Sequence, residues 1–585
     1  MNYTLNTNQT RGRESLLKSL KNFLPLLFPE KKYLLVAGAA IIVNSGINLL
    51  VPFLVGHTID RYILAREYGG VLLFSGILLV MYLVSLVASY IQTKAMGGVG
   101  QRILFNLRRQ VFAKLQELPV AFFNQNKAGD LISRINNDTD KLNQFFSQAL
   151  MQFVGNFFMI IGTGIFILSI NIRLGAAALL PAIFLLIFTV AISAYVKRKN
   201  ALNLESTGGM SAEIQESITN FKVIVAFNRR DYFRKKFNEA NQKNYSSSVG
   251  AGIVNTIFLT PLYGFVSNTA QLVVLAYGLY LIAAGSVTLG VLISFLTYVV
   301  RFYDPLRHIA SLWSQFQTSL AGWDRISDIL SLTNNLEITS AATTTSTSLL
   351  EFKNVNFGYE GGKNILHDVS FELKEGKTYA LVGPTGGGKT TTASLMARLY
   401  DPTEGTVLLR GKDIRGYADS ERTKRIGFIL QDPFLFVGTI RENIVYGNEV
   451  YEEYSTEQML LVLKKSGLDD LLQRFDNGLD TAITGNNDSI SLGQKQIIAF
   501  MRAVLRKPDL IILDEATANI DTVTEQILER ILKQLPATTT RVIIAHRLNT
   551  IENADEIFFV NGGTIARAGS FDHAVELLMQ GNRKS

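Results

Sequence analysis

The sequence predicts two structural classes in one chain: an α-helical membrane domain of six transmembrane helices with long cytoplasmic extensions, and after it an α/β domain. Three observations predict this division. Long stretches without Asp, Glu, Lys or Arg occur only in the first half of the 585 residues. A segment rich in Thr and Ser follows them. Short β-rich runs then alternate with helical stretches, a pattern typical of a largely parallel sheet.

The charge-free stretches predict the transmembrane helices. They cover residues 33–59, 68–93, 142–172, 174–196 and 244–300. Each exceeds the roughly 20 apolar residues that carry a helix across the ~30 Å hydrocarbon core. The last stretch is long enough for two crossings with a break at Gly285-Ser286, so we expect spans at about 33–59, 68–93, 142–172, 174–196, 250–283 and 286–305. The stretches also predict that no acidic or basic side chain lies at bilayer depth.

The basic residues predict the orientation of the chain. Residues 11–32, 94–141 and 197–243 contain six, eight and ten Lys or Arg, whereas the other side has only Arg61, Arg66 and Arg173. By the positive-inside rule both termini and the two long connections are cytoplasmic. This distribution accounts for much of the formal net charge of +8 without a nucleic-acid partner. Residues 1–32 are expected to form an amphipathic helix at the cytoplasmic interface.

The composition excludes several kinds of site. The chain has no Cys, which removes disulfides, thiol nucleophiles and cysteine-ligated metals. Its five His residues lie far apart, and no two have the spacing of metal ligands.

The second half carries a phosphate-binding loop. Residues 331–348 have the character of a linker, and residues 349–585 are expected to form one globular domain. The strand Thr378–Val382 precedes the sequence Gly-Pro-Thr-Gly-Gly-Gly-Lys-Thr at 383–390, and a helical pattern follows it, as the G-x-x-x-x-G-K-[ST] motif requires. We expect the backbone amides to wrap phosphates, Lys389 to reach the β- and γ-phosphates and Thr390 to ligate Mg²⁺. The sequence therefore predicts a P-loop nucleotide-binding domain.

A second strand, Leu510–Leu513, ends in the acidic pair Asp514-Glu515. A carboxylate at the carboxyl end of a strand beside the phosphate loop can hold Mg²⁺ through water, which we expect of Asp514. The adjacent Glu515 is expected to orient or activate the water that attacks the γ-phosphoryl group.

With these motifs the chain resembles the ATP-binding cassette exporters that fuse one six-helix membrane domain to one nucleotide-binding domain. The resemblance covers nearly the full length. It implies ATP contacts by an aromatic residue that stacks on adenine and by the phosphate loop: Tyr359, Gly383, Pro384, Thr385, Gly386, Gly387, Gly388, Lys389, Thr390 and Thr391. It implies a Mg²⁺-sensing and catalytic Gln431, a γ-phosphate switch at His546 and a dimer-interface loop containing Asp521. The signature that faces the partner's ATP is represented by Ser491, Gly493 and Gln494.

The same resemblance implies two coupling regions in the membrane domain, at 118–138 and 213–231. Simple packing of the helical extensions is the alternative for individual residues in these segments. Residues 485–488 lack the adjacent Glu and Arg that are common before the signature in such exporters.

One position departs from the family signature Leu-Ser-Gly-Gly-Gln, because Leu492 replaces the first glycine. In the family this segment faces the ATP bound by the other subunit, so a side chain there is expected to weaken the partner's site. Lys389, Glu515 and His546, which serve this chain's own nucleotide, are intact. This combination of an altered signature with intact residues for the chain's own nucleotide favours a heterodimer with one degenerate site over a homodimer with two slower sites.

The resemblance implies an ATP hydrolase coupled to transport, with ATP and Mg²⁺ as cofactors, in a multi-pass cell-membrane protein of a bacterial inner membrane. We expect export of amphipathic or hydrophobic small molecules, drugs or lipids, by alternating access. The partners are then the lipid bilayer, a second half-transporter and the small-molecule substrate, with no nucleic acid. A peptide exporter, an importer of the same architecture and an ATP-gated regulatory or channel protein stay open, and a soluble cassette ATPase acting on nucleic acid is disfavoured by the six spans.

Overall fold

The computed structural model divides the chain into two compact units. The helical unit comprises Asn6–Gln116 and Ala128–Ser331, and the sheet unit comprises Met1–Leu5, Glu117–Lys127 and Leu332–Ser585. The described residues are 3, 5, 24–254, 260–333, 336, 338, 347–359, 362–484, 490–514, 522–544, 554–568, 573 and 576. The predicted interfacial helix falls largely on residues 6–23, which lie outside this set.

Six helical stretches in the described residues are long and apolar enough to cross a membrane. They are Pro25–Ile63, Tyr68–Glu117, Ala128–Ile170, Ile172–Thr219, Thr260–Ala283 and Leu289–Leu330. This confirms the predicted helical membrane domain, and the protein is a multi-pass membrane protein. The individual elements are η1 (Leu24–Glu30), α2 (Lys31–Thr58), η2 (Ile59–Ile63), α3 (Tyr68–Glu117), α5 (Ala128–Ser133), η3 (Arg134–Asp138), α6 (Thr139–Gln144), η4 (Phe145–Ala149), α7 (Leu150–Ile170), α8 (Ile172–Thr219), α9 (Phe221–Ala226), α10 (Arg230–Gly252), α11 (Thr260–Ala283) and α12 (Leu289–Leu330).

Polar side chains fix the ends of the helices that face the predicted outer side. Asn171 accepts hydrogen bonds from the amides of Arg173 and Leu174, at 3.1 and 3.0 Å, and so caps α8. Asp60 accepts from the Gly290 amide at 2.7 Å and from the Thr288 hydroxyl at 2.5 Å, at the start of α12. A carboxylate is favourable at a helix amino terminus because the unpaired amides there carry positive potential. These contacts hold the outer ends of α2 and α12 at the same level.

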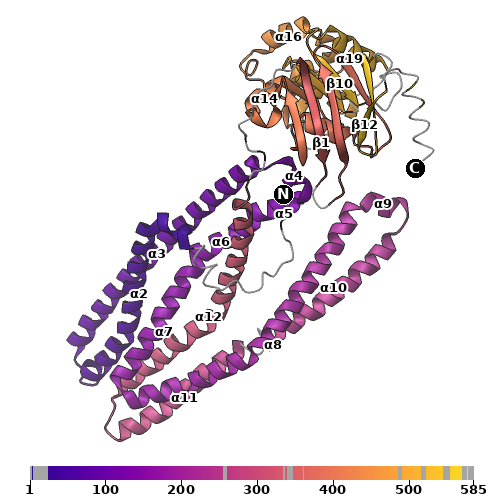
Figure 1. Cartoon of the computed structure of the whole chain (residues 1–585). Helices are drawn as coiled ribbons and strands as arrows, with labels where there is room; N and C mark the ends of the chain where they lie inside the picture. The colour runs from indigo at the N-terminus through magenta and orange to yellow at the C-terminus, as the bar shows by residue number, and fades with distance from the viewer. Residues whose placement is uncertain are drawn as a thin grey trace. The chain divides into compact units, whose positions relative to one another are not determined.

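Several helices are longer than a bilayer needs. At ~1.5 Å per residue, a helix as long as the 50-residue α3 or the 48-residue α8 exceeds the ~30 Å core more than twofold. Helices α8 and α10 run side by side in Figure 1, with the short α9 joining them at the tip. Lys236 of α10 pairs with Glu213 and Glu216 of α8 at 3.0 and 3.1 Å. The predicted extension over residues 197–243 is therefore a pair of helices.

A buried ion-pair network joins α5 to α12. The fully buried Arg134 donates from Nε to Asp130 at 2.8 Å and from Nη1 to the Arg325 carbonyl at 2.7 Å. Arg325 in turn donates to Asp130 at 2.6 Å. Buried charges are stable only when paired and hydrogen-bonded, so this network fixes the two segments to each other.

Helix α12 also packs on α2, where Pro52 interrupts the backbone hydrogen bonds of α2. Proline has no N–H, so the carbonyl four residues earlier, that of Asn48, loses its helical partner. Side chains of α12 reach this region: Ser294 donates to the Pro52 carbonyl at 2.7 Å, Tyr298 donates to the Leu49 carbonyl at 2.5 Å, and Arg301 donates to the Asn48 carbonyl. Because hydrocarbon offers no water to a free carbonyl, these donors stabilise the helix pair.

The sheet unit contains the predicted parallel sheet. Its six strands have the order β12-β11-β3-β10-β9-β6, and all adjacent pairs are parallel except β11 with β12. These strands are β3 (Thr378–Val382), β6 (Ile426–Ile429), β9 (Leu510–Asp514), β10 (Thr540–Ile544), β11 (Glu556–Asn561) and β12 (Thr564–Arg567). The predicted α/β class is confirmed.

A second, antiparallel sheet was not predicted. Its order is β2-β1-β4-β5, and a third sheet has only two strands, β7 and β8. These strands are β1 (Ser348–Phe357), β2 (Leu366–Lys374), β4 (Glu404–Leu409), β5 (Lys412–Asp413), β7 (Gly438–Thr439) and β8 (Ala482–Ile483). The parallel sheet and the antiparallel sheet share one core, since Phe352 and Leu373 of the second pack in one cluster with Leu381 and Val542 of the first.

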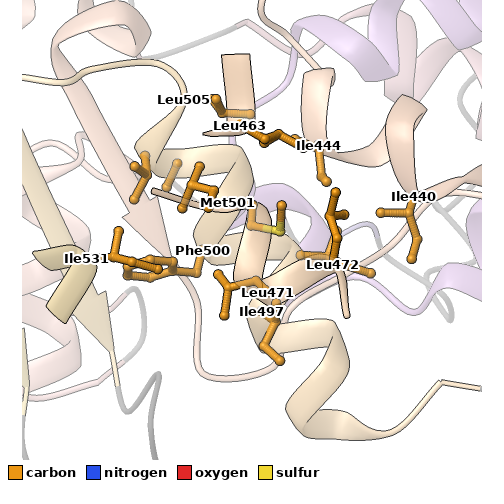
Figure 2. Packing of buried hydrophobic residues seen from close by; sticks show 14 of the residues in the cluster. Ile440, Ile444, Leu463, Leu471, Leu472, Ile497, Phe500, Met501, Leu505 and Ile531 are labelled. Atoms are coloured by element: carbon orange, nitrogen blue, oxygen red, sulfur yellow. The ribbon is translucent and has the colours of Figure 1, made fainter. Parts of the chain in front are cut away.

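Helices of the sheet unit form a second core, shown in Figure 2. Leu471, Leu472, Ile497, Phe500 and Met501 meet there, all but Leu472 and Ile497 less than 2% exposed. The helices of the unit are α4 (Val120–Gln125), α13 (Lys389–Met396), α14 (Asp419–Arg425), α15 (Ile440–Val445), α16 (Thr456–Lys465), α17 (Asp469–Leu472), α18 (Leu492–Val504) and α19 (Thr522–Gln534), with short 3₁₀ turns η6 (Ile414–Gly416) and η7 (Gly478–Asp480).

Two residues near the amino terminus belong to the sheet unit. The Tyr3 amide donates to Gln125 at 2.8 Å, and the Leu5 amide donates to Asn126 at 2.9 Å. The Tyr3 ring is 2% exposed and meets Phe122 of α4 edge-on at 6.4 Å. The Gln125 and Asn126 side chains thus accept from the backbone of Tyr3 and Leu5 and hold these two residues on α4.

Candidate nucleotide site

The phosphate loop connects β3 to α13 and depends on glycine at its first position. Gly383 follows the last residue of β3 and has φ +147°, and a Cβ there would lie 1.9 Å from the Val560 carbonyl oxygen of β11. Gly388 has φ +113° and caps α13. The chain turns here in a conformation that L side chains rarely adopt, which lets the loop backbone lie close to β11.

We predict that Gly383→Ala destabilises the sheet unit by roughly 3 kcal/mol or more, because left-handed strain and a steric overlap with rigid backbone add. Gly386→Ala is the matched control. Gly386 also has positive φ, +81°, but a Cβ there meets nothing within 4 Å. The control isolates the strain, for which we expect about 1 kcal/mol. The measurement is the thermal unfolding midpoint of the purified protein, and equal midpoints for the two variants would contradict the overlap.

Charged and polar groups gather at the carboxyl edge of the parallel sheet. Lys389, the first residue of α13, is 6% exposed, and its Nζ donates to the carbonyls of Gly383 and Pro384 at 2.9 and 3.1 Å. The Thr390 hydroxyl lies 3.4 Å from a carboxylate oxygen of Asp514, the last residue of β9. A hydroxyl and a carboxylate are hard oxygen donors of the kind that Mg²⁺ prefers, and Mg²⁺ in nucleotide sites takes few protein ligands. The described residues contain no cluster of three or more His, Cys, Asp or Glu that could hold a metal ion. A nucleotide-bound Mg²⁺ does not require such a cluster, because phosphates and water supply most of its ligands.

Tyr359 lies beside the helix that follows the loop. Its hydroxyl is 3.4 Å from that of Thr391, and its ring meets the Tyr400 ring edge-on at 5.2 Å. Tyr359 is 37% exposed, so part of the residue stays accessible to a ligand. The Tyr400 hydroxyl in turn accepts from Asn124 of α4 at 2.6 Å, and burial raises its pKa. A continuous set of contacts therefore runs within the sheet unit from the loop helix to α4.

Gln431 lies two residues after β6, at the same edge of the sheet as Asp514, because β6 and β9 are parallel neighbours. The following residues contact α18 through Arg502, which donates to the Phe434 carbonyl at 3.3 Å and the Asn443 carbonyl at 2.7 Å. Burial lowers the pKa of Arg502. Phe434, Tyr446 and Arg502 also line a groove of about 280 Å³.

The signature residues form the amino terminus of α18. The Ser491 hydroxyl accepts from the Gln494 amide at 3.2 Å, and the Ser491 amide donates to the Gln494 side chain at 2.9 Å. Gln494 also donates to the Arg474 carbonyl at 2.9 Å. The capping box holds the helix start in one geometry, with free amides and positive potential at the end.

Leu492 is the first residue of α18 and is 39% exposed. It is not among the described residues with positive φ. Leucine therefore fits the helical backbone here, and the consequence of losing glycine is the exposed side chain at the helix amino terminus.

The remaining predicted site residues lie outside the described set. They are Glu515, Asp521 and His546. Their roles stay predictions, as do the roles of the residues described above. The structure brings together Gly383 to Thr391, Asp514, Tyr359 and Gln431 in the sheet unit. Ser491 and Gln494 bond to each other, and Gln494 also donates to the Arg474 carbonyl.

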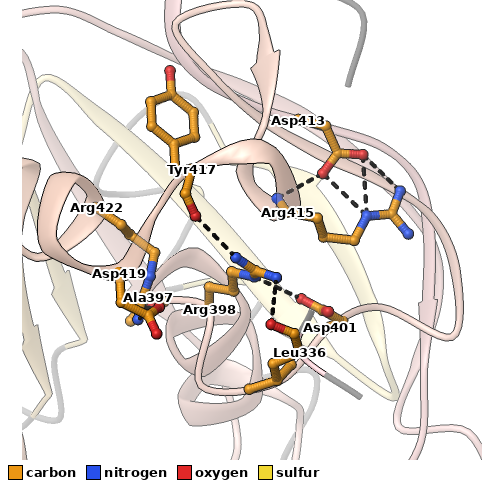
Figure 3. A network of polar contacts seen from close by, with 9 residues as sticks. All are labelled: Leu336, Ala397, Arg398, Asp401, Asp413, Arg415, Tyr417, Asp419 and Arg422. Atoms are coloured by element: carbon orange, nitrogen blue, oxygen red, sulfur yellow. Dashed lines mark hydrogen bonds and ion pairs between the residues drawn. The ribbon is translucent and has the colours of Figure 1, made fainter. Parts of the chain in front are cut away.

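Arg398, which sequence reasoning did not single out, ties the end of the loop helix to the linker (Figure 3). It is 3% exposed and donates to Asp401 at 3.1 Å, to the Tyr417 carbonyl at 3.3 Å and to the Leu336 carbonyl at 3.2 Å. Burial raises the pKa of Asp401, and Arg398 opposes that shift. Arg398 thus holds the end of the loop helix against the Tyr417 and Leu336 carbonyls. The sequence alone does not reveal this role, because the contacts join residues that are distant along the chain.

Protein-family comparisons match both units. A family model described as "ABC transporter transmembrane region" matches residues 34–306, and one described as "ABC transporter" matches residues 366–518. Together they cover most of the chain.

Full-length relatives carry similar descriptions. The chain is 34% identical to an uncharacterized ABC transporter ATP-binding protein, YfiC, of Bacillus subtilis, over 93% of this chain and 90% of that protein. It is 32% identical to a fatty acid ABC transporter ATP-binding/permease protein of Mycobacterium bovis, over 86% and 79%. It is 28% identical to a multidrug resistance ABC transporter ATP-binding and permease protein of Lactococcus lactis, over 97% and 96%.

Proposed function

Because the chain belongs to the ABC transporter family and couples ATP hydrolysis to transport across a membrane, we propose that it exports amphipathic or hydrophobic small molecules as one half of a dimer. The observation that carries this proposal is the union, in one chain, of six apolar helices with an intact phosphate loop. Relatives named for fatty acids and for multidrug resistance support drugs or lipids as substrates. A bacterial inner membrane is the proposed location.

In the proposed mechanism ATP and Mg²⁺ bind at the carboxyl edge of the parallel sheet. Lys389 would hold the phosphates, Thr390 and Gln431 would bind Mg²⁺, Asp514 would hold it through water, and Tyr359 would stack on adenine. Mg²⁺ when bound neutralises charge on the phosphates. Glu515 orients the attacking water and His546 contacts the γ-phosphate, while Asp521 lies at the dimer interface. ATP shifts the transporter toward its closed state only by its higher affinity for that state.

Helix α9 supports a second contact with the partner. Its side chains include exposed apolar groups, with Phe221 58% and Val223 56% exposed, and Phe227 follows the helix at 75%. An apolar tip on a cytoplasmic extension is costly in water, so we propose that it docks on the groove at Phe434 and Tyr446 of the partner subunit. Closure of the paired domains would then move α8 and α10 as one lever.

Leu492 supports a heterodimer over a homodimer. An exposed leucine at the signature would stand where the partner's phosphates approach, which gives one weakened composite site. The matching partner has an intact signature and a defective catalytic acid or switch. Copurification of a second, similar polypeptide with those reciprocal defects tests the heterodimer, and a stable, active dimer of this chain alone would refute it.

We predict that Leu492→Gly raises ATP turnover of the purified dimer at least severalfold if this chain forms a homodimer, because it restores both signatures. In a heterodimer whose other site lacks its catalytic acid, turnover stays within about twofold while ATP affinity at the degenerate site rises, since closer approach adds charge-assisted hydrogen bonds. Leu461→Gly on the exposed face of α16 is the control. Loss of turnover in Leu492→Gly would contradict both alternatives.

The direction of transport is tested with inside-out vesicles and a fluorescent amphipathic dye. We expect ATP-dependent uptake into the vesicles, which corresponds to export. Uptake by right-side-out cells would favour an importer, stimulation by peptides alone a peptide exporter, and ATP-dependent ion conductance without hydrolysis a channel.

A further inference from the structure

We infer that Arg301 forms, with Asn44, Asn48 and Ser85, an intramembrane site for the anionic head group of a single-chain amphiphile. The inference rests on the proposed function, because it names the class of substrate that the exporter would carry. The shared chemistry of the head group is a carboxylate or a phosphate. The inference departs from the sequence prediction that no charged group lies at bilayer depth, because Arg301 directly follows the longest charge-free stretch and continues the same helix.

The depth of Arg301 follows from both helices that hold it. Arg301 lies twelve positions after Leu289, where α12 begins, or about 18 Å at 1.5 Å per residue. Its partner Asn48 lies ten positions before Thr58, where α2 ends, or about 15 Å. Asp60 holds these two helix ends together. Both counts place the guanidinium near the middle of the ~30 Å hydrocarbon core.

Arg301 has no carboxylate partner in the part of the chain that the structure describes. Both of its hydrogen bonds to described residues use Nη1, which donates to the carbonyl of Asn48 and to the Asn48 side-chain oxygen, the latter at 2.8 Å. The nearest carboxylate along α12, Asp304, pairs with Arg307 instead at 3.8 Å. A guanidinium has five N–H donors, so those on Nε and Nη2 stay available to a ligand.

The hydrogen bond to the Asn48 carbonyl does not by itself explain why position 301 is occupied by a charged residue. Pro52 leaves that carbonyl without its helical partner, and any neutral donor would satisfy it. A positive charge at this depth is costly and marks a functional site by default. The fork of N–H groups on arginine matches the two oxygens of a carboxylate or phosphate.

Neutral polar groups of α2 and α3 extend the hydrogen-bond network from Asn48, the residue that Arg301 contacts. Asn48 donates to the carbonyl and side-chain oxygens of Asn44 at 2.9 and 3.2 Å, and Ser85 of α3 donates to Asn44 at 2.5 Å. None of them neutralises the charge. They provide a polar lining that three helices, α2, α3 and α12, hold in place.

An apolar groove lies along the same helix, α2. It has a volume of about 300 Å³ and is lined by α2 and α7, including Leu49 and Phe158. Leu49 follows Asn48 in the chain, and its carbonyl accepts from Tyr298. Helix α2 thus carries both the polar partner of Arg301 and one wall of the groove. A charge and an apolar groove on one helix inside the bilayer fit a molecule with an anionic head and a hydrocarbon tail, and we assign the groove to that tail.

The test measures equilibrium binding of radiolabelled dodecanoate to the purified transporter in nanodiscs of zwitterionic phosphatidylcholine, with empty nanodiscs subtracted. We expect Arg301→Gln to raise the Kd about tenfold or more, because charge-assisted hydrogen bonds are lost. Glutamine keeps a donor for the Asn48 carbonyl, so the helix contact survives. Arg301→Lys keeps the charge and is expected to change the Kd less than threefold. Arg307→Gln removes one positive charge from the same helix and should leave the Kd unchanged.

Competition on the wild-type protein distinguishes the ligand sources and needs no variant. Unlabelled dodecyl phosphate and unlabelled dodecanoate are compared as competitors of the radiolabelled dodecanoate. The stronger competitor carries the preferred head group, and displacement by either supports the site. Dodecanol and dodecyltrimethylammonium should compete at least tenfold more weakly. Equal competition by dodecanol, no saturable binding of dodecanoate, or a Kd within twofold of wild type in folded Arg301→Gln would each overturn the inference.

The assay separates this site from the proposed function. Binding is measured without ATP and without transport. Retained dodecanoate binding with no ATP-dependent transport would count against export alone, whereas transport of a neutral dye without dodecanoate binding would count against the anion site alone.

Discussion

Glu515→Gln is expected to lower ATP turnover at least about 100-fold while ATP affinity stays within about threefold, because a general base contributes that much and an amide cannot accept the proton. The expectation follows from the neighbouring residue. Asp514 is 2% exposed, ends β9 and lies 3.4 Å from the Thr390 hydroxyl, so β9 ends beside the phosphate loop, and Glu515 is the next residue in the sequence. Glutamine has nearly the same shape as glutamate, so the site should still bind ATP and close on it.

The measurement combines phosphate release with equilibrium binding of a labelled ATP. Glu453→Gln makes the same chemical change on an exposed loop and should leave turnover unchanged. In a heterodimer the degenerate site would supply only a small residual rate. Turnover near the wild-type value in Glu515→Gln would remove Glu515 from the role of catalytic base.

Lys389→Ala is expected to weaken ATP binding by about tenfold to 100-fold, since hydrogen bonds to a charged group contribute about 1.5–3 kcal/mol each. The Lys389 ammonium lies across the loop, where it donates to the Gly383 and Pro384 carbonyls. It is thus held at the mouth of the phosphate loop, and its loss removes both the charge for phosphate and a support of the loop.

Two measurements separate these effects. Labelled ATP binding reports the charge, and the unfolding midpoint without nucleotide reports the support. Lys377→Ala, at the exposed start of the strand that leads into the loop, is the matched control. If Lys389→Ala binds ATP as tightly as the control, the lysine does not hold the phosphates.

The sequence predicted the two structural classes because both depend on local patterns. A stretch such as 68–93 without charge has to be buried in lipid or protein. A glycine-rich turn between a strand and a helix is typical of phosphate binding. The length of α3 beyond that stretch was predicted only as helical patterning. The antiparallel sheet was missed, since β1 and β4 pair residues about 50 positions apart and nothing local in either strand specifies the partner.

Contacts between distant residues explain what else was missed. Arg301 ends a charge-free stretch, which is a visible signal, but its meaning depends on the pairing of α12 with the carbonyl that Pro52 leaves free in α2. The contact of Asn124 with Tyr400 joins residues 276 positions apart. For Leu492 the sequence showed the departure, and the structure adds that the backbone there is helical and the side chain exposed.

The division of the chain into two units has a mechanical consequence. The polypeptide passes from one unit to the other four times, after Leu5, Gln116, Lys127 and Ser331. The nucleotide-binding unit is therefore joined to the helical unit by four chain crossings and not by one linker. Cutting the chain after Ser331 would leave three crossings. They lead to Met1–Leu5 and Glu117–Lys127, and the second of these segments contains the α4 residues that Tyr3 and Tyr400 contact. Force generated by nucleotide then has parallel routes to the lipid-embedded helices, so no single hinge has to carry it.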